Sequence, residues 1–328
     1  MLKRIAVIGV CAAMLGLTAC GGFASAQNKD NGKLSVVCTT FSCYDWTREI
    51  MGDHADEVQL TYLLENGADL HSYQPTAADM VTISDCDVFV YIGGESEGWA
   101  DDALKEASNK DMKVLKLIDN HDLSAKEEEV KEGMQTDEEE TDEHEHSEAP
   151  EYDEHIWLSP KNAKILCNSI ADTLCEADPD NSDDYKANLA AYEDKLDKLD
   201  SDFEQTVSEA KIRTVIFGDR FPFRYLCDDY GLDYYAAFVG CSAETEASFE
   251  TIAFLAGKTD ELGIDTIFTI ENSDGKVAQA IINSTEKKDM TTAVLDSLQS
   301  ADKTQIADGA TYISLMEKNC ETLRTALS

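Results

Sequence analysis

Short apolar runs alternate with amphipathic helical stretches along most of this chain, and that alternation restricts the fold more than any other feature. The runs are rich in Val, Ile and Phe, as expected of strands that are buried on both faces. They occupy residues 33–40, 58–64, 87–92 and 114–118 in the first half of the chain and residues 213–218, 234–239, 266–270 and 292–295 in the second. Buried strands joined by helices form parallel sheets with helices on both sides. We therefore predict an α/β fold with two lobes, each a mainly parallel sheet flanked by helices.

A long amphipathic stretch lies between the two sets of strands. Its apolar residues recur every three or four positions: Tyr185, Leu189, Tyr192, Leu196, Leu199, Phe203 and Val207. At about 1.5 Å per residue, a helix over this stretch is about 40 Å long. Its charged positions are mostly acidic, which disfavours pairing with a second copy as a coiled coil. We expect a monomer in which residues 181–212 form a rigid helix that joins an N-terminal lobe, 33–180, to a C-terminal lobe, 213–328.

The start of the chain has the composition of a targeting segment. Two basic residues precede an apolar run that ends in small residues, a pattern typical of a secretory signal peptide. The sequence Leu17-Thr18-Ala19-Cys20 resembles a bacterial lipobox, which implies cleavage before Cys20 and lipid attachment to its sulfur. An ordinary signal peptide is the alternative. No later apolar run has the length of a membrane span. We expect residues 1–19 to be removed, residues 20–32 to form a tether, and the protein to be lipid-anchored at the extracytoplasmic face of the bacterial membrane.

The chain is strongly acidic, with a formal net charge of -39 at pH 7. Removing the two basic residues of the leader changes this charge to -41. So negative a protein is a poor partner for nucleic acid or anionic lipid and is compatible with cations. Residues 127–154 hold fifteen Asp or Glu and a single Lys. Self-repulsion and a lack of apolar residues predict a disordered acidic loop over about 122–154.

Three of the six histidines fall within a dozen residues near the end of this loop. His155 lies where the loop meets an apolar Ile-Trp-Leu step, and a neutral imidazole beside carboxylates is a good ligand for a divalent transition metal. His144 and His146 are either auxiliary metal ligands or incidental residues of the acidic tract. His71 lies in a loop with Gly and Pro after the second strand, at the sheet edge where open α/β folds place ligands. We predict that His71 and His155 bind metal.

Three motifs around these residues resemble those of one protein family. Residues 66–75, residues 153–160 and Leu295-Asp296-Ser297-Leu298 are similar, in this order, to two metal-histidine motifs and the final aspartate motif of the ZnuA-like solute-binding lipoproteins of zinc and manganese ABC importers. The resemblance covers essentially the whole mature chain. It implies two α/β lobes joined by one rigid helix, with a metal bound between them by His71, His155 and Asp296. It also implies a binding protein and not an enzyme, an ABC permease as partner, and Zn2+ as the metal with Mn2+ as the alternative.

The sequence departs from this family at the third ligand. The position that holds a histidine or glutamate in the family is occupied by Arg220, whose guanidinium cannot bind a cation. We expect Arg220 to turn away from the metal and to pair with a carboxylate. Its neighbour Asp219 is the predicted substitute, and Cys241, Glu244 and Glu271 are further candidates.

Two other classes of function fit the same composition. Histidines and an aspartate can hold a catalytic zinc in a metal-dependent hydrolase, although the sequence contains neither an HExxH motif nor a nucleophile elbow. A tethered acidic lipoprotein can also serve as an adhesin or as a metal buffer. The eight cysteines beyond Cys20 show no CxxC spacing, which argues against a zinc finger and against a thioredoxin-like site. Their disulfide pairing is left open.

Overall fold

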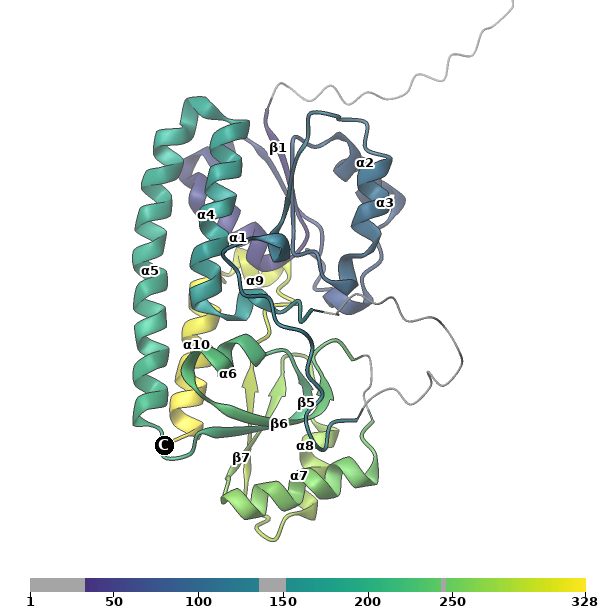
Figure 1. Ribbon diagram of the computed structural model, residues 1–328, viewed down its shortest axis with the longest axis vertical. Helices are drawn as coiled ribbons and strands as arrows, with labels where there is room; N and C mark the ends of the chain where they lie inside the picture. Colours follow the sequence, from purple (N-terminus) through teal and green to yellow (C-terminus); the bar gives the residue numbers. More distant parts are fainter. Residues whose placement is uncertain (1–32, 136–151, 243–245) are drawn as a thin grey trace, which may run out of the picture. The chain divides into compact units, whose positions relative to one another are not determined.

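The computed structural model describes residues 33–135, 152–242 and 246–328 (Figure 1). The predicted leader and tether, the lipid-attachment residue Cys20, and the residues His144, His146 and Glu244 lie outside these ranges. The predicted fold class is confirmed, because the described residues form two four-stranded sheets of parallel strands flanked by helices.

The N-terminal sheet has the strand order β2-β1-β3-β4, and its neighbouring strands are parallel. The strands are β1 (Ser35–Cys38), β2 (Gln59–Tyr62), β3 (Val88–Tyr91) and β4 (Lys113–Lys116). The helices of this lobe are α1 (Phe41–Met51), α2 (Ala77–Asp85), α3 (Trp99–Lys105) and α4 (Pro160–Ala177). In Figure 1, α1 and α4 lie on one side of the sheet and α2 and α3 on the other. This double cover explains why the central strands are apolar along almost their whole length.

Polar side chains fix where two of these helices begin. The Thr76 hydroxyl accepts a hydrogen bond from the Asp79 backbone N–H at 3.2 Å, and the Asp79 carboxylate accepts one from the Thr76 N–H at 2.7 Å. This reciprocal pair is a capping box, and it fixes the start of α2. Ser159 caps α4 with its hydroxyl. The loops that carry His71 and His155 are therefore each followed within a few residues by a capped helix.

The C-terminal sheet has the strand order β6-β5-β7-β8, again with parallel neighbours. Its strands are β5 (Thr214–Phe221), β6 (Asp233–Val239), β7 (Thr266–Ile270) and β8 (Thr291–Leu295). The helices described in this half are α6 (Arg224–Tyr230), α7 (Phe249–Leu262), α8 (Lys276–Ser284), α9 (Lys303–Ala307) and α10 (Tyr312–Ala326).

Strand β5 runs beyond its predicted end. Asp219 and Arg220 consequently lie within the strand and not in the loop that follows it. Phe221 accounts for the extension, because its ring stacks on Tyr234 of β6 with ring centroids 3.8 Å apart. The register between β5 and β6 shifts between Phe217 and Arg220. A shift of this kind marks a β-bulge, which changes the direction of nearby side chains.

The predicted linking helix is α5 (Ser182–Glu209), whose 28 residues span about 42 Å. It packs against α1 and α4 of the N-terminal lobe and against α10 of the C-terminal lobe. Of the apolar residues predicted to form its stripe, Leu189 is partly buried and the others are buried. One continuous apolar core runs from the N-terminal sheet along α5 into the C-terminal lobe, and a second, smaller core involves α7 and α8. A helix embedded in a shared core is a rigid connection between the lobes, as predicted.

Part of the acidic segment is ordered, which differs from the disorder predicted over 122–154. Residues 122–135 and 152–154 pack against other parts of the fold. For example, the Lys126 backbone N–H donates to the Tyr225 hydroxyl at 2.9 Å. The composition of a segment gives its charge. It does not show that tyrosine hydroxyls and charged side chains elsewhere in the fold form hydrogen bonds and ion pairs with that segment.

We call residues 126–135 the strap. At its far end, the backbone N–H of Gln135 donates to the Ala237 carbonyl of β6 at 2.9 Å. Near its start, Lys126 forms an ion pair with Asp228 of α6. Figure 1 shows the strap running from the N-terminal lobe alongside the C-terminal sheet. It is therefore a second link between the lobes, in addition to α5.

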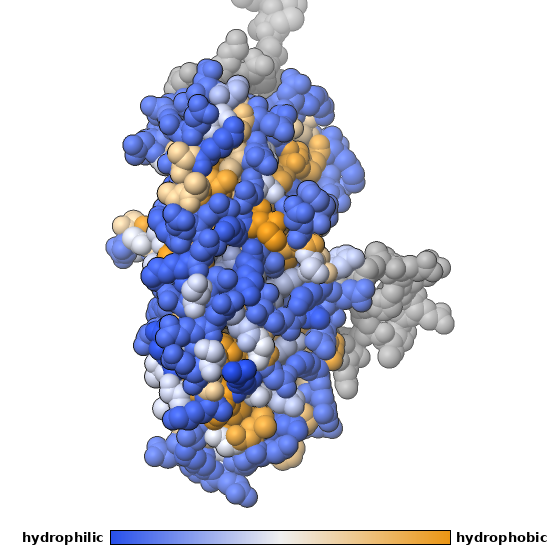
Figure 2. Space-filling model, turned by 60° about the vertical axis from the view of Figure 1, so that its left-hand side comes forward, coloured by the Kyte–Doolittle hydropathy of each residue, from blue (hydrophilic) through white to orange (hydrophobic). Residues whose placement is uncertain are grey.

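The surface agrees with the acidic composition. Figure 2 shows a mostly hydrophilic face on which apolar side chains gather only in small, separate patches. Within the described ranges, no helix has both the length and the apolar character needed to cross a membrane. The eight cysteines in these ranges are all free thiols.

Candidate metal centre

His71 lies in the loop that follows β2, inside the short 3-10 helix η2 (Leu70–Ser72). Gly67 in this loop has a φ of 72°, a left-handed conformation that glycine adopts without strain. The Asp69 carboxylate accepts a hydrogen bond from the His71 backbone N–H at 3.0 Å, and Leu70 is buried. These contacts hold the His71 ring at the carboxyl edge of the N-terminal sheet, which is the position predicted from the sequence.

His155 lies directly before the 3-10 helix η5 (Ile156–Leu158), and it is 1% exposed. Trp157 anchors this segment, because its indole N–H donates to the Ser297 carbonyl at 2.9 Å. Asp153 Oδ1 accepts two hydrogen bonds from His155, one from the backbone N–H at 2.9 Å and one from Nδ1 at 2.8 Å. A Cβ atom at Gly240 would lie 2.7 Å from His155 Cε1, so only glycine allows the chain to pass this close to the ring.

A second carboxylate holds the ring of His71. Glu154 Oε1 lies 3.0 Å from His71 Nδ1, and Ser96 Oγ lies 2.7 Å from the same nitrogen. Ser96 also donates its backbone N–H to Glu154 Oε2 at 3.1 Å and its hydroxyl to Oε1. Since carboxylate oxygens accept hydrogen bonds, Nδ1 is the protonated nitrogen in both histidine rings. Nε2 of each ring therefore carries the lone pair that can bind a metal.

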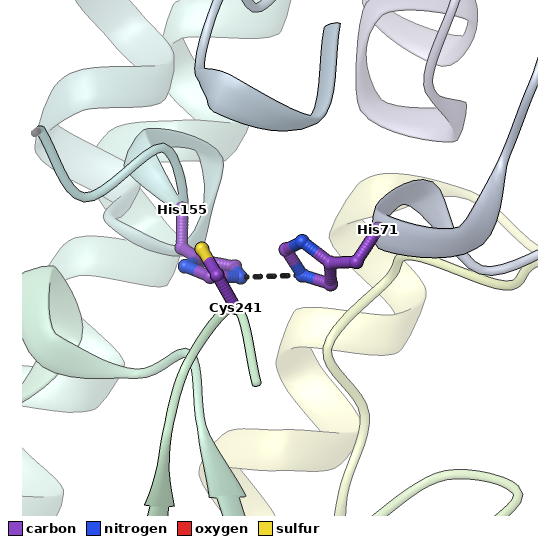
Figure 3. A group of neighbouring side chains, drawn as sticks. All are labelled: His71, His155 and Cys241. Carbon is purple, nitrogen blue, oxygen red and sulfur yellow. Dashed lines mark hydrogen bonds between the residues drawn. The ribbon is translucent and has the colours of Figure 1, made fainter. Parts of the chain in front are cut away.

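The two Nε2 atoms face each other at a distance of 3.2 Å (Figure 3). When both rings are neutral, their Nε2 lone pairs face each other, and the contact is a hydrogen bond when one ring carries a second proton. The pKa of His155 is raised, so a proton on its Nε2 can bridge the two rings, and a cation that binds there replaces that proton. Two nitrogens bound to one tetrahedral zinc ion at about 2.0–2.1 Å lie about 3.3 Å apart, close to the observed separation. The pair is arranged to share one cation.

Cys241 offers a third donor from the C-terminal lobe. It follows β6, and its Sγ forms with one nitrogen of each histidine a group of donor atoms that all lie within 4.8 Å of one another. Figure 3 shows the thiol beside the His155 ring and His71 opposite. Imidazole nitrogen and thiolate sulfur are both zinc ligands. Among the substitutes for the third ligand that the structure describes (Asp219, Cys241 and Glu271), Cys241 is the one that lies with the two histidines.

Burial and neighbouring charges shift the pKa values of these groups. Burial lowers the pKa of His71. Burial also acts against protonation of His155, but the Asp153 carboxylate contributes to outweighing it, and the pKa of that ring is raised. In Glu154, burial opposes ionisation, yet the hydrogen bond from His71 and the charges of both rings lower its pKa to about 2. Burial, together with nearby Glu154, raises the pKa of the Cys241 thiol, so a metal must displace a proton from the sulfur.

Arg220 pairs with a carboxylate, as expected. Its guanidinium forms an ion pair with Asp69 of the other lobe. Burial opposes ionisation of Asp69, but Arg220 outweighs it and lowers the pKa of that carboxyl. Asp219 Oδ1 accepts the Arg220 backbone N–H at 2.9 Å, and its Oδ2 is buried without a hydrogen-bond partner among the described residues. Asp219 does not belong to the group of three donors, so its ligation stays a prediction.

Asp296 lies directly after β8, as predicted, but outside the group of three donors. Its Oδ1 accepts the Leu298 backbone N–H at 2.8 Å. Burial and the neighbouring Glu271 raise its pKa to about 6. Glu271 accepts hydrogen bonds from the backbone N–H and the hydroxyl of Ser297, at 2.7 Å and 2.6 Å. Both acids therefore have partners within the protein, and metal binding by Asp296 stays a prediction.

A cavity of about 890 Å³ adjoins His71 between the two lobes. It is lined by His71 and Asp69 from the N-terminal lobe and by Asp219, Arg220 and Glu271 from the C-terminal lobe. Each of these residues lies at or near the carboxyl end of a strand. The carboxyl edges of both sheets thus open onto one space, which is where α/β folds bind ligands.

Comparison with known proteins identifies the family. Residues 36–326 match the family ZnuA, described as zinc-uptake complex component A, periplasmic. The chain belongs to the ZnuA family. The match covers nearly the whole chain after the predicted tether and confirms the resemblance that rested on three motifs.

The relatives of this ZnuA-family chain include proteins named for zinc. It is 30% identical over 320 residues to the high-affinity zinc uptake system protein ZnuA of Bacillus subtilis, covering 97% of this chain and 96% of that protein. It is 32% identical over 295 residues to the zinc-binding protein AdcA of Streptococcus pyogenes, covering 89% of this chain but 56% of AdcA. The chain thus spans about half the length of the AdcA relatives that it matches. The crystal structure of the Zn(II)-bound ZnuA-like domain of Streptococcus pneumoniae AdcA has a TM-score of 0.71 to this chain at 29% identity, covering 90% of this chain and 99% of that one.

The family model is described as a component of a zinc-uptake complex, which argues against the hydrolase alternative. Of the predicted ligands, His71 and His155 come together, while Asp219 and Asp296 do not join them. Sequence reasoning gave no role to the orienting carboxylates. Their signal was the repeated acid immediately before His155, since a carboxylate that holds Nδ1 commonly accompanies a metal-binding histidine.

Proposed function

We propose that this chain is the extracytoplasmic binding component of a zinc ABC importer, which captures one Zn2+ ion between its lobes and delivers it to a membrane permease. The observation that carries the proposal is the facing pair of Nε2 atoms 3.2 Å apart in rings whose Nδ1 atoms are held by carboxylates. Such rings can share a proton, and a metal ion that binds both replaces that proton. The zinc-uptake proteins in the same family support this function.

His71, His155 and Cys241 are the proposed ligands, and zinc is the proposed metal. Imidazole and thiolate suit zinc, whereas manganese prefers carboxylate and water oxygens. Mn2+, the alternative from the sequence, fits this donor set less well. Asp219 and Asp296 are the candidates from the sequence for an additional ligand.

We also propose that a lipid on Cys20 anchors the mature chain, as a monomer, outside the bacterial membrane. The lipobox-like sequence and the periplasmic description of the family support this location. His144 and His146 of the acidic segment are proposed to hold additional cations weakly. A surface charge of this sign draws cations toward the protein and repels nucleic acid.

Metal analysis of the mature chain, purified from residue 21 onward without chelators, tests the function. We expect one zinc per chain, and competition titrations against a chelator of known affinity should show much tighter binding of zinc than of manganese. A chain that binds neither metal tightly, or manganese only, contradicts the proposal. Tight zinc binding without any chain-dependent zinc uptake by cells indicates a metal buffer or an adhesin instead of an importer component.

A further inference from the structure

The loop that carries His71 is attached to the C-terminal half of the chain at two points. At the start of the loop, the Glu65 carbonyl accepts a hydrogen bond from the Lys303 backbone N–H at 2.9 Å. Further along, the Asp69 carboxylate forms an ion pair with the Arg220 guanidinium. This second contact lies two residues before His71, so it bears directly on the position of that ring.

The Asp69 carboxylate joins the ion pair to the backbone of His71. Arg220 Nη1 lies 3.4 Å from Asp69 Oδ1, and Nη2 donates to Oδ2, so the guanidinium contacts both oxygens. Asp69 Oδ1 also accepts the His71 backbone N–H at 3.0 Å. A guanidinium that contacts both oxygens of a carboxylate fixes the orientation of that group. Arg220 thereby orients the acceptor that holds the His71 backbone.

Arg220 is carried by the same pair of strands that places Cys241. It lies near the end of β5, and Cys241 follows the end of the neighbouring strand β6. A Cβ atom at Gly240 would lie 3.1 Å from the Phe221 carbonyl, so the two segments run close together just beyond the ion pair. Figure 3 shows His71 and Cys241 on separate segments that meet at the site. The ion pair thus connects the loop of one proposed ligand to the strands that place another.

The ion pair is better shielded from water than an ordinary surface pair. The Arg220 and Asp69 side chains are 15% and 29% exposed. For comparison, the side chains of Arg324 and Glu321, which form an ion pair on α10, are 44% and 65% exposed. Exposed pairs contribute little because salt and water screen them, whereas partly buried pairs are screened less. The contact between Arg220 and Asp69 is therefore able to hold the two segments together.

We propose that Arg220 is a positioning residue of the metal centre, which acts through Asp69 to hold His71 where it shares one zinc ion with Cys241. This inference rests on the proposed zinc-binding function. It predicts an effect opposite in sign to that of the charge. A positive charge near the site repels Zn2+, so its removal alone would strengthen binding. The loss of a positioning contact weakens binding instead.

Zinc competition titrations of the mature chain with Arg220→Gln test the proposal. The glutamine removes both the charge and the two-point contact with Asp69. We expect zinc affinity to fall by at least about tenfold, as is common when a contact that orients a metal ligand is lost. Arg324→Gln is the matched control, because it removes the same type of side chain from an exposed ion pair, and we expect a change of less than about twofold. Unchanged or tighter binding by Arg220→Gln overturns the proposal, and so does an equal loss in the control.

A double-mutant cycle shows whether Arg220 acts through Asp69. Asp69→Asn keeps an oxygen that accepts the His71 N–H but lacks the negative charge. If the pair acts as a unit, the double variant binds zinc about as weakly as the weaker of the two single variants. Losses that multiply overturn the proposal, because Arg220 then acts independently of Asp69. Wild-type affinity in the double variant overturns it too, because the balance of charge then matters and the contact does not.

Asp274→Asn controls for the negative charge that Asp69→Asn removes. Asp274 lines the same cavity, and its side chain is 58% exposed. We expect its replacement to change zinc affinity by less than about twofold. A loss equal to that of Asp69→Asn would show an effect of charge alone and would overturn the proposal. If Arg220→Gln does not fold, as judged by circular dichroism, the comparison of Asp69→Asn with Asp274→Asn decides.

Hydrogen exchange in the metal-free chain separates positioning from a general loss of stability. The His71 amide should exchange faster in Arg220→Gln than in the wild-type chain, while the amides of β7 keep their wild-type rates. An ion pair that serves only the fold would speed both and leave zinc affinity unchanged, and that result overturns the proposal. Failure of the wild-type chain to bind zinc one-to-one refutes the proposed function itself, and the exchange rates still show whether Arg220 holds the His71 loop.

Discussion

Two carboxylates determine which nitrogen each histidine offers to a metal. Asp153 and Glu154 hold the Nδ1 atoms of His155 and His71, and such outer partners commonly contribute about 10–100-fold to metal affinity. They also fix the separation of the Nε2 atoms at 3.2 Å before any metal arrives. That separation suits bonds of about 2.0–2.1 Å to zinc, and it suits the longer bonds of calcium less well. We therefore expect the proposed site to favour zinc through geometry as well as through donor type.

Replacing either histidine should abolish tight zinc binding while leaving the fold intact. We expect His71→Ala and His155→Ala each to weaken zinc binding at least about 100-fold, because each removes one of few ligands and leaves an orphaned partner. Competition titration measures the affinity, and circular dichroism checks the fold. His121→Ala is the control, since that side chain is 90% exposed. Wild-type affinity in both single variants would refute the site.

Both histidines could be predicted because each lies in a loop at the end of a regular element, beside turn residues or an apolar step. The choice of Cys241 could not, because it depends on a contact across the fold. The Cys241 thiol lies 3.8 Å from Glu154 Oε1, a residue 87 positions earlier in the chain. The spacing of residues in a single sequence does not reveal such a long-range contact. Nothing in the sequence around Cys241 therefore distinguishes it from the other cysteines.

Replacing Cys241 with serine should weaken binding without preventing it. A hydroxyl is a poorer zinc ligand than a thiolate, so we expect the zinc affinity of Cys241→Ser to fall by about 10–100-fold. The cobalt-substituted protein offers a direct check, because a cobalt–thiolate bond gives a charge-transfer absorption band that serine cannot. Persistence of that band in Cys241→Ser would show that another sulfur binds the metal. Cys175→Ser, at a partly buried cysteine outside the group of donors, is the matched control.

The bounds of helices and strands that depend on local sequence were predicted closely. The bounds of segments that depend on contacts with distant residues were not. Strand β7 has the predicted bounds, and α5 lies within its predicted range, because apolar periodicity alone defines them. The end of β5 and the strap differ from prediction because each depends on rings and hydroxyls from other parts of the fold. Phe221 extends β5 by stacking on Tyr234, and the Tyr225 hydroxyl accepts a hydrogen bond from the backbone of the strap.

Deleting residues 137–148 should leave the tight site unchanged. These residues carry eight Asp or Glu together with His144 and His146, and they exclude the strap. We expect zinc affinity at the centre to change less than twofold, while the number of weakly bound zinc ions falls. Equilibrium dialysis over a wide range of zinc concentrations measures both. Loss of one-to-one binding would mean that the acidic segment supplies a primary ligand.

Several acidic side chains are buried, and their ionisation lowers the stability of the folded chain. Burial is the first cause that raises the pKa of Glu97 to about 7 and the pKa values of Asp45 and Asp296 to about 6. A raised carboxyl pKa means that the folded chain keeps a proton at a pH where the unfolded chain has lost it. Stability from these groups is therefore present at low pH and is lost as pH rises through 6 to 7. The large negative net charge acts in the same direction.

Stability and zinc affinity should consequently change in opposite directions with pH. Between pH 8 and pH 5 we expect the melting temperature of the metal-free chain to rise by at least about 3 °C. Over the same range zinc affinity should fall, because protons compete at Cys241 and His155, whose pKa values are both raised. Scanning calorimetry and zinc titration at matched pH values provide the comparison. A parallel fall of both quantities would contradict the assignment of the buried acids as protonated.

Protonation of Glu154 limits the stability of the folded chain at low pH. Its pKa is lowered to about 2, because the hydrogen bond from His71 and the charges of the two rings outweigh burial. The stability from this carboxylate is present above its ordinary pKa and is lost as pH falls from there toward 2. The melting temperature should therefore pass through a maximum near pH 5, and the same calorimetric series extended to pH 3 checks it.

The free thiols of this fold have a consequence for the surroundings in which the protein works. The eight cysteines in the described ranges form no disulfide, so folding of this part of the chain waits for no oxidant and no disulfide isomerase. Burial raises the pKa of most of these thiols, which keeps them in the protonated form that peroxides attack slowly. A chain built this way matures as well without oxygen as with it.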